Sequence, residues 1–177
     1  MKKIVAALLC WVALCAALFA ADPLRRAPGF CLMDTTGQWR DLADYRGKIV
    51  LVEFMQTNCP HCASFSSVLG GLTLRYGDKL AVLAIGNPPE TAQTMTQFVN
   101  GHKLTYPLLF DQGQVGYSYV RAQSIDLPAV FLIDGNGMIR NSWQNGPLTK
   151  DIFEGAGLAR EIDKLMAGAP AAAPARK

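Results

Sequence analysis

The chain has 177 residues, with 17 Lys and Arg against 14 Asp and Glu and a formal net charge of +3. This length suits one folded domain, and a hydrophobic content of 50% with 18% charged residues excludes a mainly disordered chain. The charge excess is too small for a nucleic-acid-binding protein, and no basic stripe with interleaved aromatic residues is present. We therefore expect no nucleic-acid partner.

The first 21 residues have the pattern of an export signal. Lys2 and Lys3 precede the uncharged segment 4–21, which Asp22 and Pro23 end. A basic start, an apolar run and small residues at its end form a secretory signal peptide, although a run of this length also suits a membrane anchor. In both cases the domain is expected in the periplasm or another extracytoplasmic space, where disulfides persist.

Residues 28–166 have the pattern of one α/β domain, and 167–177 that of a flexible Ala/Pro tail. The apolar, β-branched runs at 49–54 and 80–85 are typical of central strands covered on both faces. In chain order, we predict strands at 29–33, 49–54, 80–85, 106–110, 129–133 and 138–143, and helices at 42–45, from 60 onward, 90–100, 114–120 and 150–166. This alternation predicts an α/β sandwich with a mixed sheet.

Cys59-Pro60-His61-Cys62 stands where a buried strand gives way to a helix, and this context makes the C-x-x-C pair a candidate redox dithiol. Unpaired amides at a helix N-terminus would stabilise a thiolate on Cys59, and Cys62, one turn later, is near enough to form a disulfide. Pro60 suits the first turn because its missing N–H has no helical partner there. A protonated His61 would tune the pair by favouring the thiolate, which makes the disulfide a better oxidant.

Two other interpretations of the pair stay open. The cysteines could form a structural disulfide that ties the start of the helix, or half of a zinc site. Zinc needs two more ligands, and the sequence offers only the distant His102 and no second C-x-x-C. We expect no metal and no cofactor. Cys31 is interpreted as a small packed side chain.

Family-specific motifs lie along the whole folded unit. They are residues 27–34 (APGFCLMD), 45–48 (YRGK), 50–54 (VLVEF), Cys59-x-x-Cys62, Tyr106-Pro107, Phe110-Asp111, Leu127-Pro128 and 131–137 (FLIDGNG). In this order they resemble the TlpA/ResA-like thiol–disulfide oxidoreductases of the thioredoxin superfamily. The resemblance implies a thioredoxin-like fold, with a central mixed β-sheet flanked by helices, an N-terminal β-hairpin and a central βα insertion. It also implies extracytoplasmic exchange with the thiols and disulfides of substrate proteins and of a recycling partner.

The resemblance also suggests roles for three residues outside the dithiol. Pro128 matches the cis-proline that faces the dithiol, and Leu127 would then offer its backbone to a bound substrate strand. Glu53 matches a buried acid, whose pKa burial should raise, and it would take the proton of Cys62 as that thiol attacks a mixed disulfide. An ordinary turn proline and a surface or structural glutamate are the alternatives.

Some positions depart from the family pattern. Asn58 stands where the family commonly has Trp, and Cys-Pro-His-Cys is typical of DsbA-type oxidants. Asn87 takes the place of an acid that often follows the strand of the insertion, with Glu90 slightly later. The direction of electron flow therefore stays open, and we expect a reductase or exchange role with a potential raised by His61.

Two alternative functions share parts of this pattern. A peroxiredoxin-like peroxidase has Thr three residues before its reactive Cys, where this chain has Gln56, with Thr57 one position too late. A copper chaperone of the SCO type binds Cu(I) through soft thiolates, but it spaces its cysteines C-x-x-x-C and adds a distal His.

Overall fold

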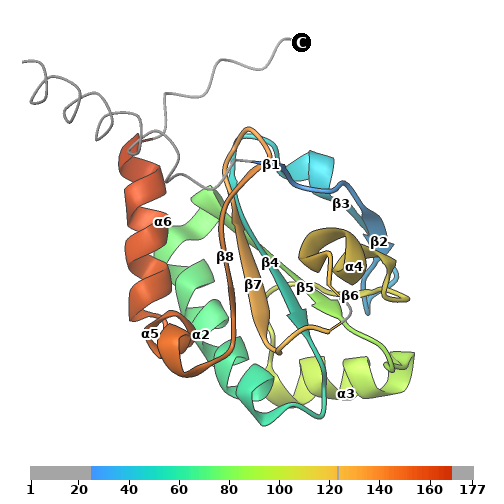
Figure 1. Cartoon of the computed structure of the whole chain (residues 1–177). Coiled ribbons are helices and arrows are strands. Elements are labelled where there is room, and N and C mark those ends of the chain that lie inside the picture. Colours follow the sequence, from blue (N-terminus) through green and yellow to red (C-terminus); the bar gives the residue numbers. More distant parts are fainter. Residues whose placement is uncertain (1–24, 123, 169–177) are drawn as a thin grey trace, which may run out of the picture.

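The computed structural model describes residues 25–122 and 124–168; the predicted signal or anchor at 1–21 lies outside them. A six-stranded sheet with the order β1-β8-β7-β4-β5-β6 forms the centre (Figure 1). β4, β5 and β6 are parallel, whereas β7 pairs antiparallel with β4, β8 with β7 and β1 with β8. The strands are β1 (Arg25–Arg26), β4 (Ile49–Met55), β5 (Leu80–Gly86), β6 (Leu108–Phe110), β7 (Ala129–Ile133) and β8 (Met138–Gln144). The predicted mixed sheet is confirmed.

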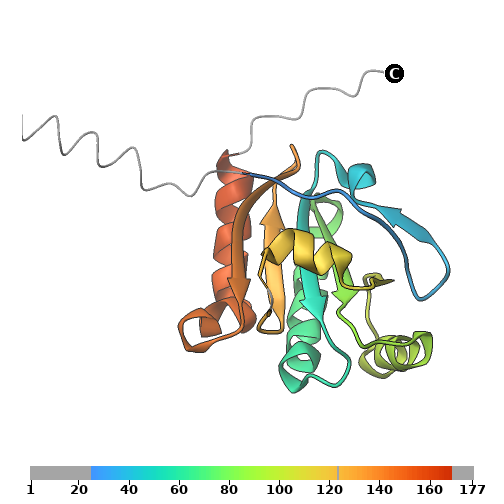
Figure 2. The ribbon, with the colours of Figure 1, turned by 45° about the vertical axis from the view of Figure 1, so that its right-hand side comes forward.

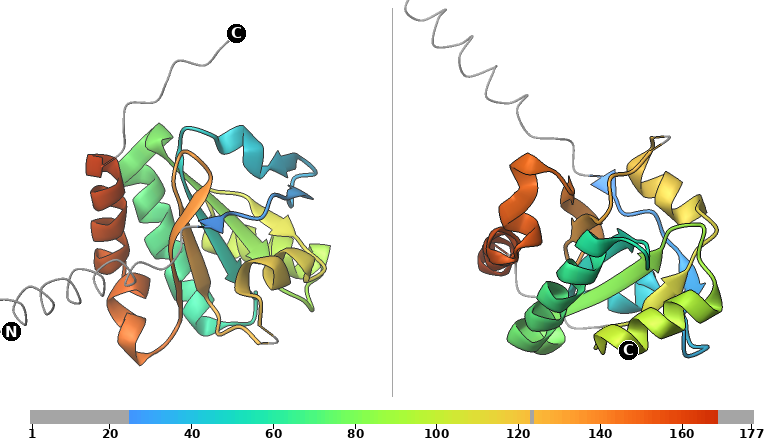
Figure 3. Two further views of the ribbon diagram at one scale, coloured as in Figure 1. Left: turned by 45° about the horizontal axis from the view of Figure 1, so that its top comes forward. Right: turned by 90° about the horizontal axis from the view of Figure 1, so that it is seen from below.

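Helices cover both faces of this sheet. In Figure 2, α4 lies in front of the strands and α2 and α6 lie behind them; Figure 3 shows the same two layers from two further directions. The helices are α2 (Pro60–Tyr76), α3 (Ala92–His102), α4 (Gln114–Val120), α5 (Lys150–Phe153) and α6 (Ala156–Gly168), with 3-10 turns η1 (Leu42–Tyr45), η2 (Gly77–Lys79) and η3 (Pro147–Thr149). A hydrophobic core therefore lies on each side of the sheet.

The alternation of side chains along β4 decides which core each residue enters. Leu51 and Met55 pack with α2, whereas Val52 and Phe54 pack with Tyr119 of α4. Glu53 has the same parity as Leu51, so its carboxylate falls on the α2 side of the sheet, inside an otherwise apolar core.

The two additions implied by the family resemblance are present. The N-terminal hairpin consists of β2 (Cys31–Met33) and β3 (Trp39–Asp41), paired antiparallel. The central insertion consists of α3 and β6, between β5 and α4, and β6 extends the sheet beside β5. The insertion places α3 next to the end of β4, where the dithiol lies.

The C-terminal helix differs from its prediction. A single helix was expected over 150–166, but the chain forms α5 and α6 with a break between them. Gly155 has a φ of 96°, and a Cβ on it would lie 2.7 Å from Val68 Cγ1. Because L side chains rarely adopt this φ, the break depends on glycine. α6 continues to Gly168, so the first two residues assigned to the tail are helical, and 169–177 lie outside the described residues.

The N-terminal boundary also differs. β1 pairs with β8 through Arg25 and Arg26, so the fold begins before the predicted start at residue 28. A two-residue strand held by backbone pairing has no side-chain pattern to detect. Cys31 is exposed on β2, so its interpretation as a packed side chain is wrong. Among the helices of the described residues, none is both long and apolar enough to span a membrane.

Candidate active site

Cys59 caps the helix that follows the central strand. β4 ends at Met55, a turn closes with the Cys59 N–H donating to the Gln56 carbonyl at 3.2 Å, and α2 begins at Pro60. The Cys59 Sγ accepts a hydrogen bond from the Cys62 backbone N–H at 3.2 Å. This side chain is partly exposed. The predicted position of Cys59 at the helix N-terminus is therefore present, and stabilisation of a thiolate there stays a prediction.

Cys62 has the opposite environment. It has no exposed surface, and both cysteines are free thiols in this structure. Burial raises the pKa of the Cys62 thiol, the Cys59 side chain raises it further, and a hydrogen bond from the Gln56 backbone acts against both. The two sulfurs therefore differ in exposure: the Cys59 sulfur is partly accessible to other molecules, and the Cys62 sulfur is buried.

The Leu127–Pro128 segment faces Cys59. The Leu127–Pro128 peptide bond is cis, as the family resemblance implied. The Cys59 thiol lies 3.9 Å from the Leu127 carbonyl oxygen, in position to donate a weak hydrogen bond to it. Pro128 is buried, and its carbonyl accepts from the Asn145 N–H at 3.0 Å, which fixes the segment against the end of β8. The structure thus brings Leu127 and Pro128 to the dithiol.

Glu53 lies in the core beneath α2, only 1% exposed, and no group of the described residues forms a hydrogen bond with its Oε1. Burial raises its pKa to about 8, and its charge acts on the Cys62 thiol. Tyr106, also buried, donates to the Ser66 carbonyl at 3.4 Å; burial raises its pKa, and Glu53 and Cys62 raise it further. Tyr106 was not predicted as a site residue, because only β6 of the insertion brings it under α2.

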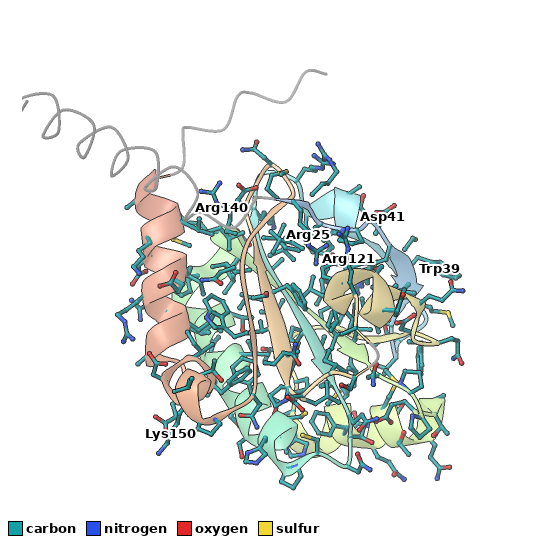
Figure 4. All side chains as sticks on the ribbon, viewed as in Figure 1. Arg25, Trp39, Asp41, Arg121, Arg140 and Lys150 are labelled. Atoms are coloured by element: carbon teal, nitrogen blue, oxygen red, sulfur yellow. The ribbon has the colours of Figure 1, made fainter. Side chains whose placement is uncertain are left out.

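His61 is exposed at the start of α2 and lines an open groove of about 440 Å³. Among the described residues, no hydrogen bond joins His61 to Cys59, so its tuning role stays a prediction. The groove's other lining residues are Ser64, Asn145, Gly146, Pro147, Lys150, Phe153 and Glu154. Figure 4 labels Lys150 on α5, at the end of the molecule where α2 begins, and Arg25 and Arg121 at the other end.

Features of the two alternative functions can be checked at this site. The Thr57 hydroxyl, one position away from the peroxidase pattern, donates to Glu90 Oε2 at 3.0 Å. In the part of the chain that the structure describes, no three His, Cys, Asp or Glu side chains are grouped so as to hold a metal ion. Neither arrangement favours the alternative over a dithiol.

Comparison with known families decides the classification. Residues 23–142, more than half of the chain, match the AhpC/TSA family. The chain belongs to this family. It is 29% identical over 132 residues to the thioredoxin-like protein YneN of Bacillus subtilis, which covers 73% of this chain and 75% of YneN. It is 32% identical over 132 residues to the thiol–disulfide oxidoreductase ResA of Geobacillus kaustophilus, covering 72% of each.

Solved structures of thiol–disulfide proteins agree with the fold. A Chlorobium tepidum protein assigned as the thiol:disulfide interchange protein DsbE superposes with a TM-score of 0.66 at 26% identity, over 79% of this chain and 98% of that one. A DsbF homologue from Corynebacterium diphtheriae shares the fold, with a TM-score of 0.70 at 20% identity, over 81% and 88% of the two chains. The chain is a ResA-like thiol–disulfide oxidoreductase of the thioredoxin superfamily, as the sequence predicted.

Proposed function

We propose that this enzyme exchanges the Cys59–Cys62 dithiol with disulfides of substrate proteins in an extracytoplasmic space. The observation that carries the proposal is the inequality of the two sulfurs, one partly exposed at a helix N-terminus and one fully buried. An accessible thiolate attacks and a shielded thiol resolves, which suits the two steps of disulfide exchange.

In the first step, the Cys59 thiolate attacks one sulfur of a substrate disulfide. A Cys59–substrate disulfide forms, the substrate S–S bond breaks, and the first substrate thiolate leaves and takes up a proton. Pro128 shapes the contact surface, and the Leu127 backbone pairs with the substrate strand beside Cys59. The short distance from Cys59 to the Leu127 carbonyl supports this role.

In the second step, Cys62 loses its proton and attacks Cys59 Sγ. The Cys59–Cys62 disulfide forms, the mixed disulfide breaks, and the second substrate sulfur leaves as a thiolate that takes up a proton from water, so the substrate gains the two electrons that the enzyme loses. Glu53 in its ionised form takes the Cys62 proton, and in its protonated form returns it when a recycling partner reduces the enzyme. A pKa of about 8 allows both forms near neutral pH.

The location follows from residues 1–21 as a signal peptide or an anchor, with a membrane tether through residues 4–21 in the second case. The folded domain then operates where protein disulfides persist. N-terminal sequencing of the mature chain from an envelope fraction distinguishes a cleaved signal from a retained tether, and recovery of the intact chain in the cytoplasm contradicts the location.

Insulin reduction with dithiothreitol as the electron source tests the activity. Cys59→Ala should abolish turnover, and Cys62→Ala should accumulate a mixed disulfide through Cys59. Cys31→Ala, which removes the exposed thiol outside the site, is the matched control and should keep full activity. Retained turnover in Cys59→Ala contradicts the assignment. A reduction potential near about −270 mV indicates the reductive direction that we propose, and one near about −120 mV an oxidant.

A further inference from the structure

Hydrogen bonds join a loop at the start of the insertion to the loop that leads to the dithiol. Four hydrogen bonds join residues 87–90, after β5, to residues 55–57, at the end of β4. The Asn87 N–H donates to the Met55 carbonyl at 2.8 Å, and the Gln56 side-chain amide donates to the Pro88 carbonyl at 2.8 Å. The other two hydrogen bonds run from Thr57 to the Glu90 carboxylate.

Glu90 provides the only charged group in this set of four bonds. Its Oε1 accepts from the Thr57 backbone N–H at 2.6 Å, and its Oε2 accepts from the Thr57 hydroxyl at 3.0 Å and from the Thr94 hydroxyl at 2.6 Å. Hydrogen bonds to an ionised acceptor are shorter and stronger than neutral ones. Thr94 lies in the first turn of α3, so the carboxylate joins the dithiol loop to the insertion helix.

Thr57 is joined by its peptide bond to a backbone carbonyl that helps to fix Cys59. The Gln56 carbonyl accepts from the Cys59 N–H at 3.2 Å, so it fixes the turn that ends at the N-cap cysteine. A shift of the Thr57 amide moves the Gln56 carbonyl with it, because the Thr57 N–H and the Gln56 C=O belong to the same planar peptide unit. The N-cap position of Cys59 therefore depends on where Thr57 is held.

We infer that Glu90 is a positioning residue for the dithiol, which it holds at the helix N-terminus through the backbone amide of Thr57. Without the carboxylate, the Thr57 N–H loses its acceptor and the turn at 56–59 relaxes, so the Cys62 amide stabilises the Cys59 thiolate less. The inference rests on the proposed role of Cys59 as the attacking sulfur.

The competing explanation is that Glu90 acts only through its negative charge. A carboxylate near Cys59 would oppose thiolate formation, so removing the charge would make Cys59 more reactive. The positioning explanation predicts the opposite change, because Cys59 should become less reactive when the carboxylate is removed. The two explanations also differ for Glu90→Gln, which retains an oxygen to accept from Thr57 but has no charge, and for Glu90→Asp, which retains the charge but is one methylene too short.

The experiment measures two quantities in a Cys31→Ala background: the rate of Cys59 alkylation by iodoacetamide at pH 7, and the equilibrium constant of the dithiol with glutathione. Glu90→Ala and Glu90→Asp should each slow alkylation about tenfold and shift the equilibrium about tenfold toward the disulfide, or about 30 mV. Glu90→Gln should stay within about threefold of the parent. Glu161→Ala, which removes a carboxylate bonded to Lys164 on α6, is the matched control and should change neither quantity.

Faster alkylation in both Glu90→Ala and Glu90→Gln supports the charge explanation and overturns the inference, as does an unchanged rate in Glu90→Ala. Circular dichroism checks that each variant folds; if Glu90→Ala does not, the comparison of Glu90→Asp with Glu90→Gln decides between the explanations. Failure of the proposed function is distinguishable, because it would appear as a parent enzyme that alkylates at Cys59 but does not reduce insulin.

Discussion

Asp34 and Glu53 are both buried carboxylates, only 2% and 1% exposed, yet their surroundings are opposite. Asp34, after the β2 strand, accepts from the Thr36 N–H and hydroxyl, the Gln38 N–H and the Arg40 guanidinium at 2.6 to 3.0 Å. The Glu53 Oε1 accepts from no group of the described residues. One carboxylate is surrounded by donors, and the other lies among apolar side chains beside a thiol.

The pKa values of the two acids move apart accordingly. Burial alone would raise the pKa of Asp34, but hydrogen bonds from Thr36, Gln38 and Arg40 outweigh it and lower the pKa to about 2. Burial without such donors raises the pKa of Glu53 to about 8. Donors, not depth, therefore decide whether a buried acid is a fixed structural anion or a proton carrier. Asp34 stabilises the hairpin, and Glu53 remains able to exchange a proton near neutral pH.

The largest expected effect is the pH dependence that Glu53 gives to stability. Its folded pKa is raised, so between about pH 4.5 and pH 8 the unfolded chain has lost a proton that the folded chain keeps, and stability falls as pH rises. The parent should lose about 4 kcal/mol of unfolding free energy over this window. Glu53→Gln should lose this dependence, as urea denaturation at pH 5, 6.5 and 8 would show.

The two proteins share every other titratable group, so the difference between the two profiles isolates Glu53. Parallel profiles for the parent and Glu53→Gln would mean that Glu53 is ionised in the folded state, and would remove the contrast with Asp34. Glu53→Gln should also slow the release of substrate from the Cys59 mixed disulfide, because Cys62 then lacks its proton acceptor.

Asp34 should give the free energy of unfolding the opposite pH dependence, and the effect should be smaller. Because its folded pKa is lowered, its stabilisation is present above about pH 4 and is lost as pH falls through about 2. Asp34→Asn should cost about 2 kcal/mol at pH 7, since Arg40 and the hairpin amides lose a charged acceptor. It should leave insulin reduction intact. Reduced turnover without reduced stability would contradict a purely structural role for Asp34.

The smallest effect is expected at Tyr106, whose hydroxyl makes one long hydrogen bond to Ser66. Tyr106→Phe keeps the ring that covers this part of the core, so it should cost under about 1 kcal/mol and leave the pH profile due to Glu53 unchanged. Tyr106→Ala removes the ring, admits water and should lower the pKa of Glu53. The same pH profiling checks both variants, and a shift in Tyr106→Phe alone would show that the hydroxyl itself acts on Glu53.

Much of the fold was predictable because its signals are local. The apolar runs of β4, β5 and β7 and the predicted 114–120 helix were found where the structure has them. β1 was missed, since Arg25 and Arg26 are held by backbone pairing to a strand more than a hundred residues away. Gly155 is visible in the sequence of the predicted C-terminal helix. The break at Gly155 depends on its contact with Val68 of α2, which the sequence of the helix does not contain.

The residues of the candidate site also differ in whether a local signal in the sequence could identify them. Cys59 and Cys62 were predictable from the strand-to-helix context, and Pro128 and Glu53 from family motifs. The contact of Glu90 with Thr57 joins residues 33 apart in sequence, with α2 and β5 between them. It depends on how β5 and β4 align side by side, which no motif within either segment encodes.

β1 enters the sheet at the end remote from the sulfur atoms. Arg25 and Arg26 pair with Ile139 and Met138, at the start of β8, whereas Gln144 at its other end pairs with Ala129, next to Pro128. A strand of this length extends roughly 20 Å, and Figure 1 shows β1 at the top and the start of α2 at the bottom. The chain therefore enters the domain, at Arg25, at the end of the sheet opposite to the dithiol. If the proposed tether holds the enzyme to a bilayer, the Cys59 end of the domain is the end farther from the point of attachment.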